Sequence, residues 1–202
     1  MANKPPKLLI RGEREHPILR KHPWIFSGSI KRVLGDPAPG ETVKVTGEEG
    51  NFLAWASYSP ESQIRARILS WTESQRIGPD LFKERLKTSL AGRNRNRIGS
   101  NALRLVHGES DGMPGLIVDR YQDVLVLQIL SAGMERWREE ILALLDELEA
   151  PSSIYERSDV EVRSLEGYEP RSGLLRGEPP PEFIPIREGE LHFNVDVRNG
   201  HK

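Results

Sequence analysis

The chain has 202 residues, of which 37% are hydrophobic and 29% are charged, and its formal net charge is −1. This is the composition of an ordinary globular protein with one large or two small domains. Cysteine is absent, which excludes disulfides, thiolate metal sites and cysteine nucleophiles within these residues. No apolar run approaches the roughly 20 residues of a membrane span and no export signal is recognisable, so a cytoplasmic location is expected.

Charge divides the chain into two halves. Residues 1–100 carry 18 Lys and Arg against 10 Asp and Glu, whereas residues 101–202 carry 11 against 20. Such an asymmetry indicates two modules, of which the first is the candidate for a polyanionic partner. The alternative interpretation is that surface charge merely fluctuates along the chain.

The first module is expected to be a small β-barrel. Residues 12–23 are polar and contain two prolines, Pro17 and Pro23, which is consistent with a short helical turn. The last expected strand places Arg65 and Arg67 on the face opposite Ile64, Ala66 and Ile68. Five short strands and one small helix in about 70 residues are typical of a compact barrel. The five strands are expected at residues 7–11, 24–27, 41–46, 52–58 and 64–71.

The second module is expected to be an α+β domain, joined to the first between Ser70 and Pro79. Its centre is residues 103–130, where three apolar runs separated by polar turns predict an antiparallel meander. The last run, VLVLQIL, barely alternates and should be covered on both faces. The glycines and proline of GESDGMPG indicate a shaped connection between the first two strands.

Helices and further strands surround this meander. One helix is expected to begin at Pro79 and Asp80, and a second to be capped by Ser131 and closed by Pro151. A strand should begin at Ile154, residues 164–181 are loop-like, and residues 182–186 and 191–197 form a final hairpin. The predicted fold is therefore a mainly antiparallel sheet with helices on one side.

Motifs for catalysis are scarce. There is no GxGxxG before a helix, no Walker loop and no GxSxG, and the five histidines lack metal-ligand spacing, so no catalytic, cofactor-binding or metal-binding residue is assigned. The carboxylates Glu109, Asp111 and Asp119 flank the meander and are candidates for the acid/base pair of a hydrolase. The alternative is that they only form turns.

Cations and aromatic rings alternate in the first module. Arginine on phosphates and aromatic rings under unstacked bases recognise single-stranded or looped RNA. The alternative is that Trp24 and Phe26 belong to the core. The first helix ends with three arginines, Arg93, Arg95 and Arg97. Either their positive charge only stabilises the negative C-terminal end of the helix, or they contact RNA. The candidate RNA-binding residues are Arg11, Arg14, Arg20, Lys21, His22, Trp24, Arg65 and Arg67.

Five motifs carry a resemblance to a known family. They are HPWIFSG (22–28), YSPESQIRARI (58–68), HGESDGMPGLIVDRY (107–121), SIYERSDVEVRSLEG (153–167) and GEPPPEFIPI (177–186). In this order, and followed by NGHK, they resemble the N-terminal half of the bacterial RlmI-type large-subunit rRNA cytosine-5 methyltransferases. The resemblance implies a PUA-like RNA-binding domain at residues 1–76, an α+β middle domain at 77–198 and, at 199–202, the start of a connection to an absent methyltransferase domain.

The resemblance also implies a function. In the family the C-terminal domain holds S-adenosylmethionine and the catalytic cysteines, neither of which these residues supply. The chain is therefore expected to bind large-subunit ribosomal RNA and position it, without a cofactor of its own and without activity alone. No membrane is expected as a partner, and a homodimer is left open. The competing functions are the carboxylate hydrolase and an acidic scaffold that docks a protein.

Overall fold

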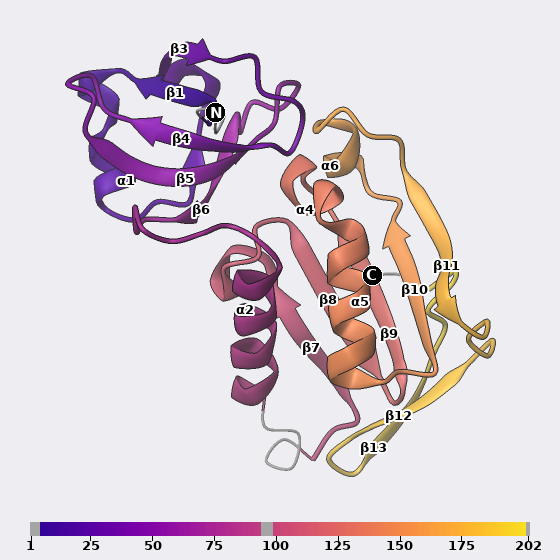
Figure 1. Ribbon diagram of the computed structural model, residues 1–202. Coiled ribbons are helices and arrows are strands. Elements are labelled where there is room, and N and C mark those ends of the chain that lie inside the picture. Colours follow the sequence, from indigo (N-terminus) through magenta and orange to yellow (C-terminus); the bar gives the residue numbers. More distant parts are fainter. Residues whose placement is uncertain (1–4, 94–98, 201–202) are drawn as a thin grey trace.

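Two β-rich units lie side by side in the computed structural model, which describes residues 5–93 and 99–200 (Figure 1). The first unit contains a six-stranded sheet with the order β2-β6-β5-β4-β1-β3, in which only the β1–β4 pair is parallel. Among the described residues, no helix is both long and apolar enough to cross a membrane. The strands are β1 (Lys7–Ile10), β2 (Trp24–Ile25), β3 (Ile30–Leu34), β4 (Thr42–Thr46), β5 (Phe52–Tyr58) and β6 (Ala66–Ser70).

This sheet corrects two expectations. It is a half-barrel and not a closed barrel, because its edge strands β2 and β3 are not paired with each other and β2 is only two residues long. The strand β3 was not predicted from the sequence. Four of its five residues are exposed, including Val33 and Leu34, so it lacks the alternation of buried and exposed positions that reveals a strand.

The second unit contains the predicted meander. Strands β7 (Ala102–His107), β8 (Leu116–Tyr121) and β9 (Val124–Ile129) pair antiparallel in sequence order, as expected. Strand β10 (Ser153–Ser158) pairs in parallel with β9, and β11 (Arg171–Gly177) pairs antiparallel with β10 at the edge of the sheet. The mainly antiparallel arrangement is therefore confirmed.

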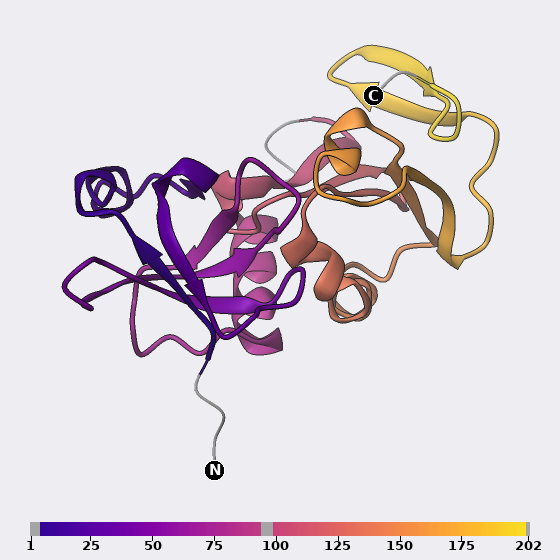
Figure 2. The same ribbon diagram turned by 90° about the horizontal axis from the view of Figure 1, so that it is seen from above.

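Helices cover one face of this sheet, and the final hairpin packs against the other (Figures 1 and 2). The helices are α2 (Pro79–Gly92), α4 (Ala132–Arg136) and α5 (Arg138–Glu149), and the hairpin is β12 (Ile184–Glu188) with β13 (Leu191–Val195). Leu125 and Leu127 of β9 face the helices, whereas Val124 and Val126 pack against Ile184 and Ile186. The prediction that β9 is covered on both faces is confirmed.

Two expectations for the second unit were wrong. Residues 171–177 form the edge strand β11 inside the segment expected to be a loop, because its polar, mostly exposed residues carry no apolar signal. The second long helix is two helices, α4 and α5, which break at Trp137. Its predicted cap is confirmed, since the Ser131 side chain accepts a hydrogen bond from the Met134 amide.

The connection between β7 and β8 is shaped by close contacts. It contains a short 3₁₀ helix, η3 (Gly108–Asp111), which ends at Gly112 in the left-handed conformation. Gly115 has a φ of +86°, and a Cβ placed there would lie 2.6 Å from the Ser131 side chain. The backbone therefore needs glycine at this point, and the resulting turn presents Glu109 toward the first unit.

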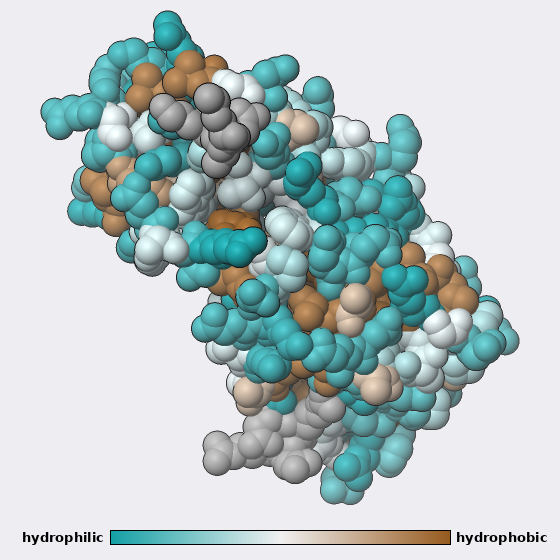
Figure 3. All heavy atoms as spheres, viewed as in Figure 1, coloured by the Kyte–Doolittle hydropathy of each residue, from teal (hydrophilic) through white to brown (hydrophobic). Residues whose placement is uncertain are grey.

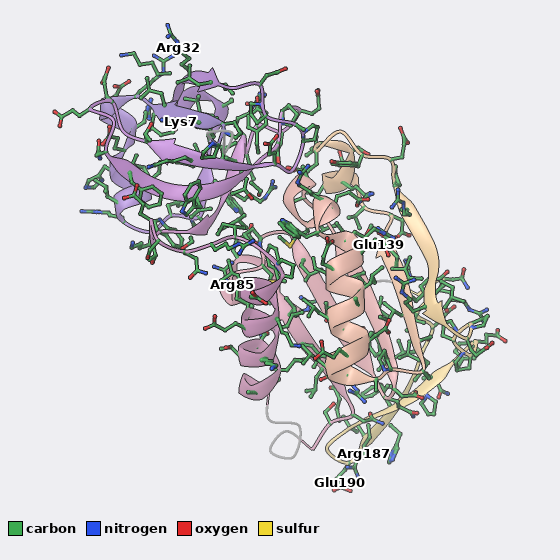
Figure 4. All side chains as sticks on the ribbon, viewed as in Figure 1. Lys7, Arg32, Arg85, Glu139, Arg187 and Glu190 are labelled. Carbon is green, nitrogen blue, oxygen red and sulfur yellow. The ribbon has the colours of Figure 1, made fainter. Side chains whose placement is uncertain are left out.

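The two units share a buried interface. Leu69 of β6 belongs to the core of the second unit, and the Arg85 guanidinium of α2 donates to the Leu69 carbonyl oxygen. Figure 4 shows Arg85 at this junction. A Cβ on Gly133 of α4 would lie 2.6 Å from the Cβ of Ser57 on β5, so the backbones approach too closely for a larger residue. The α4 helix and the first sheet are therefore packed directly on each other.

Candidate nucleic-acid interface

A tight turn after the first short helix, α1 (His16–Leu19), positions the predicted cations. The Lys21 amide donates to the Ile18 carbonyl oxygen (2.9 Å) and the His22 amide to that of Pro17 (3.0 Å), which is the Schellman arrangement. Lys21 has a φ of 66° at the position where glycine is usual. Its ammonium group lies 5.2 Å from the centroid of the Trp71 ring, and this cation–π contact helps to hold the strained turn.

Three aromatic rings follow this turn. The His22 and Trp24 ring centroids are 6.0 Å apart, and Phe26 lies 6.4 Å from each of them. The side chains of Trp24 and Phe26 are 37% and 47% exposed, so the alternative that they belong to the core is wrong. We refer to Arg20, Lys21, His22, Trp24 and Phe26 as the α1–β2 surface. Exposed rings beside cations can stack unpaired bases.

A chain of contacts connects this surface with the second unit. The Trp24 indole donates to Glu109 Oε1 (2.6 Å), and the same oxygen lies 3.8 Å from Arg67 Nε. Trp24 is also the cross-strand neighbour of Arg67 in the β2–β6 pair. The exposed Trp24 ring of the first unit is therefore held in place by Glu109, a carboxylate of η3 in the second unit.

Glu166 is the buried end of that chain. Its side chain is 1% exposed and receives Arg67 Nη1 at 2.7 Å. It also accepts hydrogen bonds from Ser59 Oγ (2.8 Å) and from the Ala132 amide at the start of α4 (3.2 Å). One carboxylate therefore binds strand β6 and the residue after β5 in the first unit, and the start of one helix in the second. Sequence reasoning missed Glu166, because its partner Arg67 lies 99 residues away and no local pattern links them.

The structure corrects the predicted placement of Arg65 and Arg67. All five residues of β6 are buried, and Arg67 is only 7% exposed. Arg65 is half-buried and donates to the Pro60 carbonyl oxygen. Alternation correctly places these arginines opposite the core of the first unit, but it does not reveal that the second unit covers that face. They do not form an open cationic surface.

The other predicted RNA-binding residues fall into two groups. Arg20, Lys21, His22 and Trp24 lie together on the α1–β2 surface. Arg11 and Arg14 are exposed, and Arg11 lies near Glu48, which accepts a hydrogen bond from the Gly12 amide (3.1 Å). The hydrogen bond from Lys31 holds the pKa of Glu48 below its usual value, with Arg11 adding a smaller effect. Arg11 is therefore partly neutralised by a neighbouring acid.

The three meander carboxylates do not form an acid/base pair. Asp111 accepts hydrogen bonds from Arg93 Nη1 (2.7 Å), Arg93 Nη2 (2.8 Å) and the His107 amide (2.6 Å). Burial raises the pKa of Asp111, but these hydrogen bonds outweigh it and hold the pKa below its ordinary value. Asp119 is paired with Arg104 (2.8 Å) and Glu109 with Trp24. Each carboxylate has its own structural partner, which opposes the hydrolase hypothesis.

The basic end of α2 is only partly described. Arg93 is bound to Asp111, so its side chain stabilises the connection between β7 and β8. Arg95 and Arg97, the other arginines of that prediction, lie outside the described residues.

Comparisons with known proteins agree with this arrangement. A PUA-like domain model matches residues 8–71, which include all six strands of the first sheet except the first residue of β1. Proteins named "Ribosomal RNA large subunit methyltransferase I" from Yersinia pseudotuberculosis (serotype O:1b) and Yersinia pestis (bv. Antiqua) are 44% identical over 97% of this chain. The resemblance to the N-terminal part of RlmI-type methyltransferases is confirmed. The chain spans about half the length of these relatives, since 50% of each is covered.

Solved structures share the fold. A putative SAM-dependent methyltransferase from Streptococcus mutans matches with a TM-score of 0.78 and 20% identity, covering 96% of this chain and 49% of that one. A putative methyltransferase complexed with SAH matches with a TM-score of 0.79 and 19% identity, again over 96% of this chain and 49% of the other. At these identities the likeness concerns the fold alone.

The described residues do not fit a S-adenosylmethionine site. The connection from β6 into α2 contains a single glycine, Gly78, and the connection from β9 into α4 has only two residues. Neither is a glycine-rich loop between a strand and a helix. The glycines at 108–115 connect two strands instead. We therefore assign no cofactor contact to the described part of this chain.

Proposed function

We propose that this chain is the RNA-binding and substrate-positioning part of a S-adenosylmethionine-dependent large-subunit rRNA (cytosine-5) methyltransferase. Residues 1–76 supply the RNA-binding domain, and residues 77–198 supply the domain relative to which the bound RNA is oriented. The rRNA is the partner, the location is the cytoplasm, and residues 199–202 begin the connection to the catalytic domain. Whether two copies associate stays a prediction.

The α1–β2 surface is the observation that carries this proposal. Arg20 and Lys21 form no ion pair with any described residue, and three rings are presented beside them. Cations without an ion-pair partner attract phosphates, and exposed rings stack on unpaired bases. The contact between Trp24 and Glu109 ties this surface to the second unit, so that bound RNA takes a fixed direction relative to it.

The competing functions are less well supported. An acidic docking scaffold needs free carboxylates, but many acidic side chains of the second half are engaged by arginines of the same unit. Examples are Glu156 with Arg138 (2.5 Å) and Glu135 with Arg163 (3.0 Å). Figure 3 shows hydrophilic side chains over most of the visible surface, with apolar patches scattered among them. This view gives no broad apolar surface for a protein partner.

RNA binding can be tested with the 202-residue chain and fragments of large-subunit rRNA. The double variant Trp24→Ala/Phe26→Ala should bind at least tenfold more weakly, since each stacked base contributes about 1–3 kcal/mol. The matched control is Phe183→Ala/Phe193→Ala, which removes two rings that are 53% and 46% exposed on or beside the final hairpin. Equal losses in both variants would contradict the assigned surface.

Methyl transfer provides the second test. The 202-residue chain should transfer no labelled methyl group to rRNA, because attack at C6 of cytosine requires a nucleophile such as a thiolate and the chain contains no cysteine. Joining it to the remaining half of an RlmI-type relative should restore transfer, since a shared chain raises the effective concentration of bound RNA. Transfer by the 202 residues alone would overturn the division of roles.

A further inference from the structure

A cleft lies where the two units meet, next to the α1–β2 surface. It is lined by residues 61–64 and Arg67 of the first unit and by Val162 and residues 164–167 of the second, and encloses about 500 Å³. This volume lies within the range of small-molecule sites, roughly 300–1,000 Å³. In Figure 1 the short helix α6 (Glu161–Ser164) approaches the first unit at this point.

Each wall of the cleft carries apolar side chains among its polar residues. Ile64 contributes from the first unit, and Val162 and Leu165 from the second. Val162 is 45% exposed and Leu165 is 61% exposed, although each is next to a buried residue of the second unit. Facing apolar side chains of this kind can sandwich a flat ring.

Arg67 supplies the polar part of the cleft. The residue is 7% exposed, and only its Nη1 forms a hydrogen bond, to Glu166. Nη2 has no hydrogen-bond partner among the described residues and is not among their fully buried polar atoms without a partner. An arginine edge held in one orientation and still able to donate can recognise a ligand with two adjacent acceptors.

Charge decides which ligand fits. Glu166 contacts Arg67 directly, Glu109 lies 3.8 Å from it, and Glu61 also lines the cleft. Two of these carboxylates lie beside the guanidinium and the third lines the same cleft, so the surroundings are negative, which disfavours a phosphate. A neutral planar group with hydrogen-bond acceptors is favoured instead, and nucleobases have these properties.

The cleft is continuous with the proposed RNA path. Ser27, which follows Phe26, is bound to Gln63 of the cleft through its amide (2.9 Å) and its hydroxyl (3.0 Å). Trp24 is the cross-strand neighbour of Arg67. A strand stacked on Trp24 and Phe26 would therefore pass the opening of the cleft.

We propose that the junction cleft accepts one unpaired nucleobase of the bound RNA. The ring lies between Ile64 and Leu165, and Arg67 donates to adjacent acceptors on its edge. Guanine, with O6 and N7, is the preferred base, because arginine pairs with these two atoms more often than with any other base edge. This inference rests on the proposed RNA-binding function and adds a specific base site to it.

Abasic scanning of a single-stranded heptanucleotide tests the site. The probe is a uridine heptamer with one guanine, and an abasic ribose replaces each position in turn while fluorescence anisotropy reports affinity for the 202-residue chain. Loss of the guanine base should weaken binding about tenfold, the size expected for one recognised base. Loss of other bases should matter less.

Leu165→Lys is the diagnostic variant, and Leu191→Lys is its control. Both leucines are exposed to nearly the same degree, 61% and 63%, and both variants gain one positive charge. Each should bind the abasic probe at least as tightly as the parent chain does. Only Leu165→Lys should lose the preference for the guanine-bearing probe, to less than about threefold, since it removes one wall of the cleft.

The outcomes separate the two proposals. If both probes bind equally well to the parent chain, the base site is wrong while the proposed function stands, and the exposed Leu165 and Val162 are left to a protein contact. A preference for guanine that survives in Leu165→Lys would also overturn the site. Failure of the parent chain to bind any RNA probe or rRNA fragment would overturn both proposals.

Discussion

The cations of the two units differ in what surrounds them. On the α1–β2 surface, Arg20 and Lys21 form no ion pair with any described residue. In the second unit, eight described arginines are paired with carboxylates of the same unit. They are Arg93, Arg104, Arg120, Arg138, Arg157, Arg163, Arg171 and Arg176. Net charge therefore distinguishes the two halves of the chain, and the pairing then separates cations that are already engaged by carboxylates from those that are not.

Arg67 belongs to the paired class although it lies in the basic half. Its partner Glu166 is almost fully buried and also binds Ser59 and the start of α4. The pair therefore serves the interface between the units. An arginine committed in this way can still recognise a neutral group but does not add to the attraction of RNA phosphates.

Removing Glu166 should have the largest effect on stability. The variant Glu166→Ala leaves Arg67 buried without its partner, which should lower the free energy of unfolding by about 3 kcal/mol. Urea unfolding measures this. The control is Glu139→Ala, whose side chain is 69% exposed and paired with Arg176, and which should cost less than about 1 kcal/mol. Equal losses would mean that the buried pair does not hold the interface.

Charge reversal on the α1–β2 surface should weaken RNA binding about a hundredfold at low salt, because two cations without ion-pair partners are replaced by anions. The variant is Arg20→Glu/Lys21→Glu, and titration at several salt concentrations should show a shallower dependence, by roughly 0.7 per lost phosphate contact. The control Arg171→Glu/Arg176→Glu reverses two paired arginines of the second unit. A comparable loss in the control would show that pairing does not decide availability.

The Asp111–Arg93 pair should produce a defined pH dependence. Because the folded pKa of Asp111 is lowered, its stabilisation is present above the unfolded pKa, about 3.9, and is lost as pH falls through the folded value. Asp111→Asn should therefore cost about 2 kcal/mol between pH 5 and 7, and this cost should shrink progressively as the pH falls below about 4. Unfolding at each pH measures the difference. A constant difference down to pH 3 would contradict the lowered pKa.

The smallest effect is expected at Arg11 and Arg14. Both are exposed, but the acid Glu48 lies near Arg11, so Arg11→Ala/Arg14→Ala should reduce RNA affinity less than about threefold at moderate salt. The control Arg32→Ala removes a cation on the part of the first unit that faces away from the second (Figure 4). A loss as large as that of the Arg20 and Lys21 reversal would extend the interface to this region.

Local pattern predicted much of the fold. The meander, the Ser131 cap and the two-sided burial of β9 followed from apolar runs, turn residues and a capping side chain. The edge strands β3 and β11 were missed, because their mostly exposed residues show no hydrophobic period. Strand prediction from burial therefore fails where a strand is not buried.

The candidate site was predicted less completely. Arg20, Lys21, His22 and Trp24 were predicted together because cations and rings adjoin in the sequence, and they lie together in the structure. Their contact with RNA stays a prediction. Arg65 and Arg67 were assigned to the same surface, since nothing in their own strand reveals that the second unit covers it. Contacts between units depend on residues that are distant in sequence, and these become visible only in the fold.

Photochemical cross-linking tests the central claim most directly. An rRNA fragment containing 4-thiouridine is irradiated in complex with the 202-residue chain, and the linked peptides are identified by mass spectrometry. Cross-links should concentrate on the segment from Arg20 to Phe26, with Trp24 and Phe26 as the main sites. Cross-links confined to β12 and β13 or to the paired arginines of the second unit, with none at Trp24 or Phe26, would contradict the account.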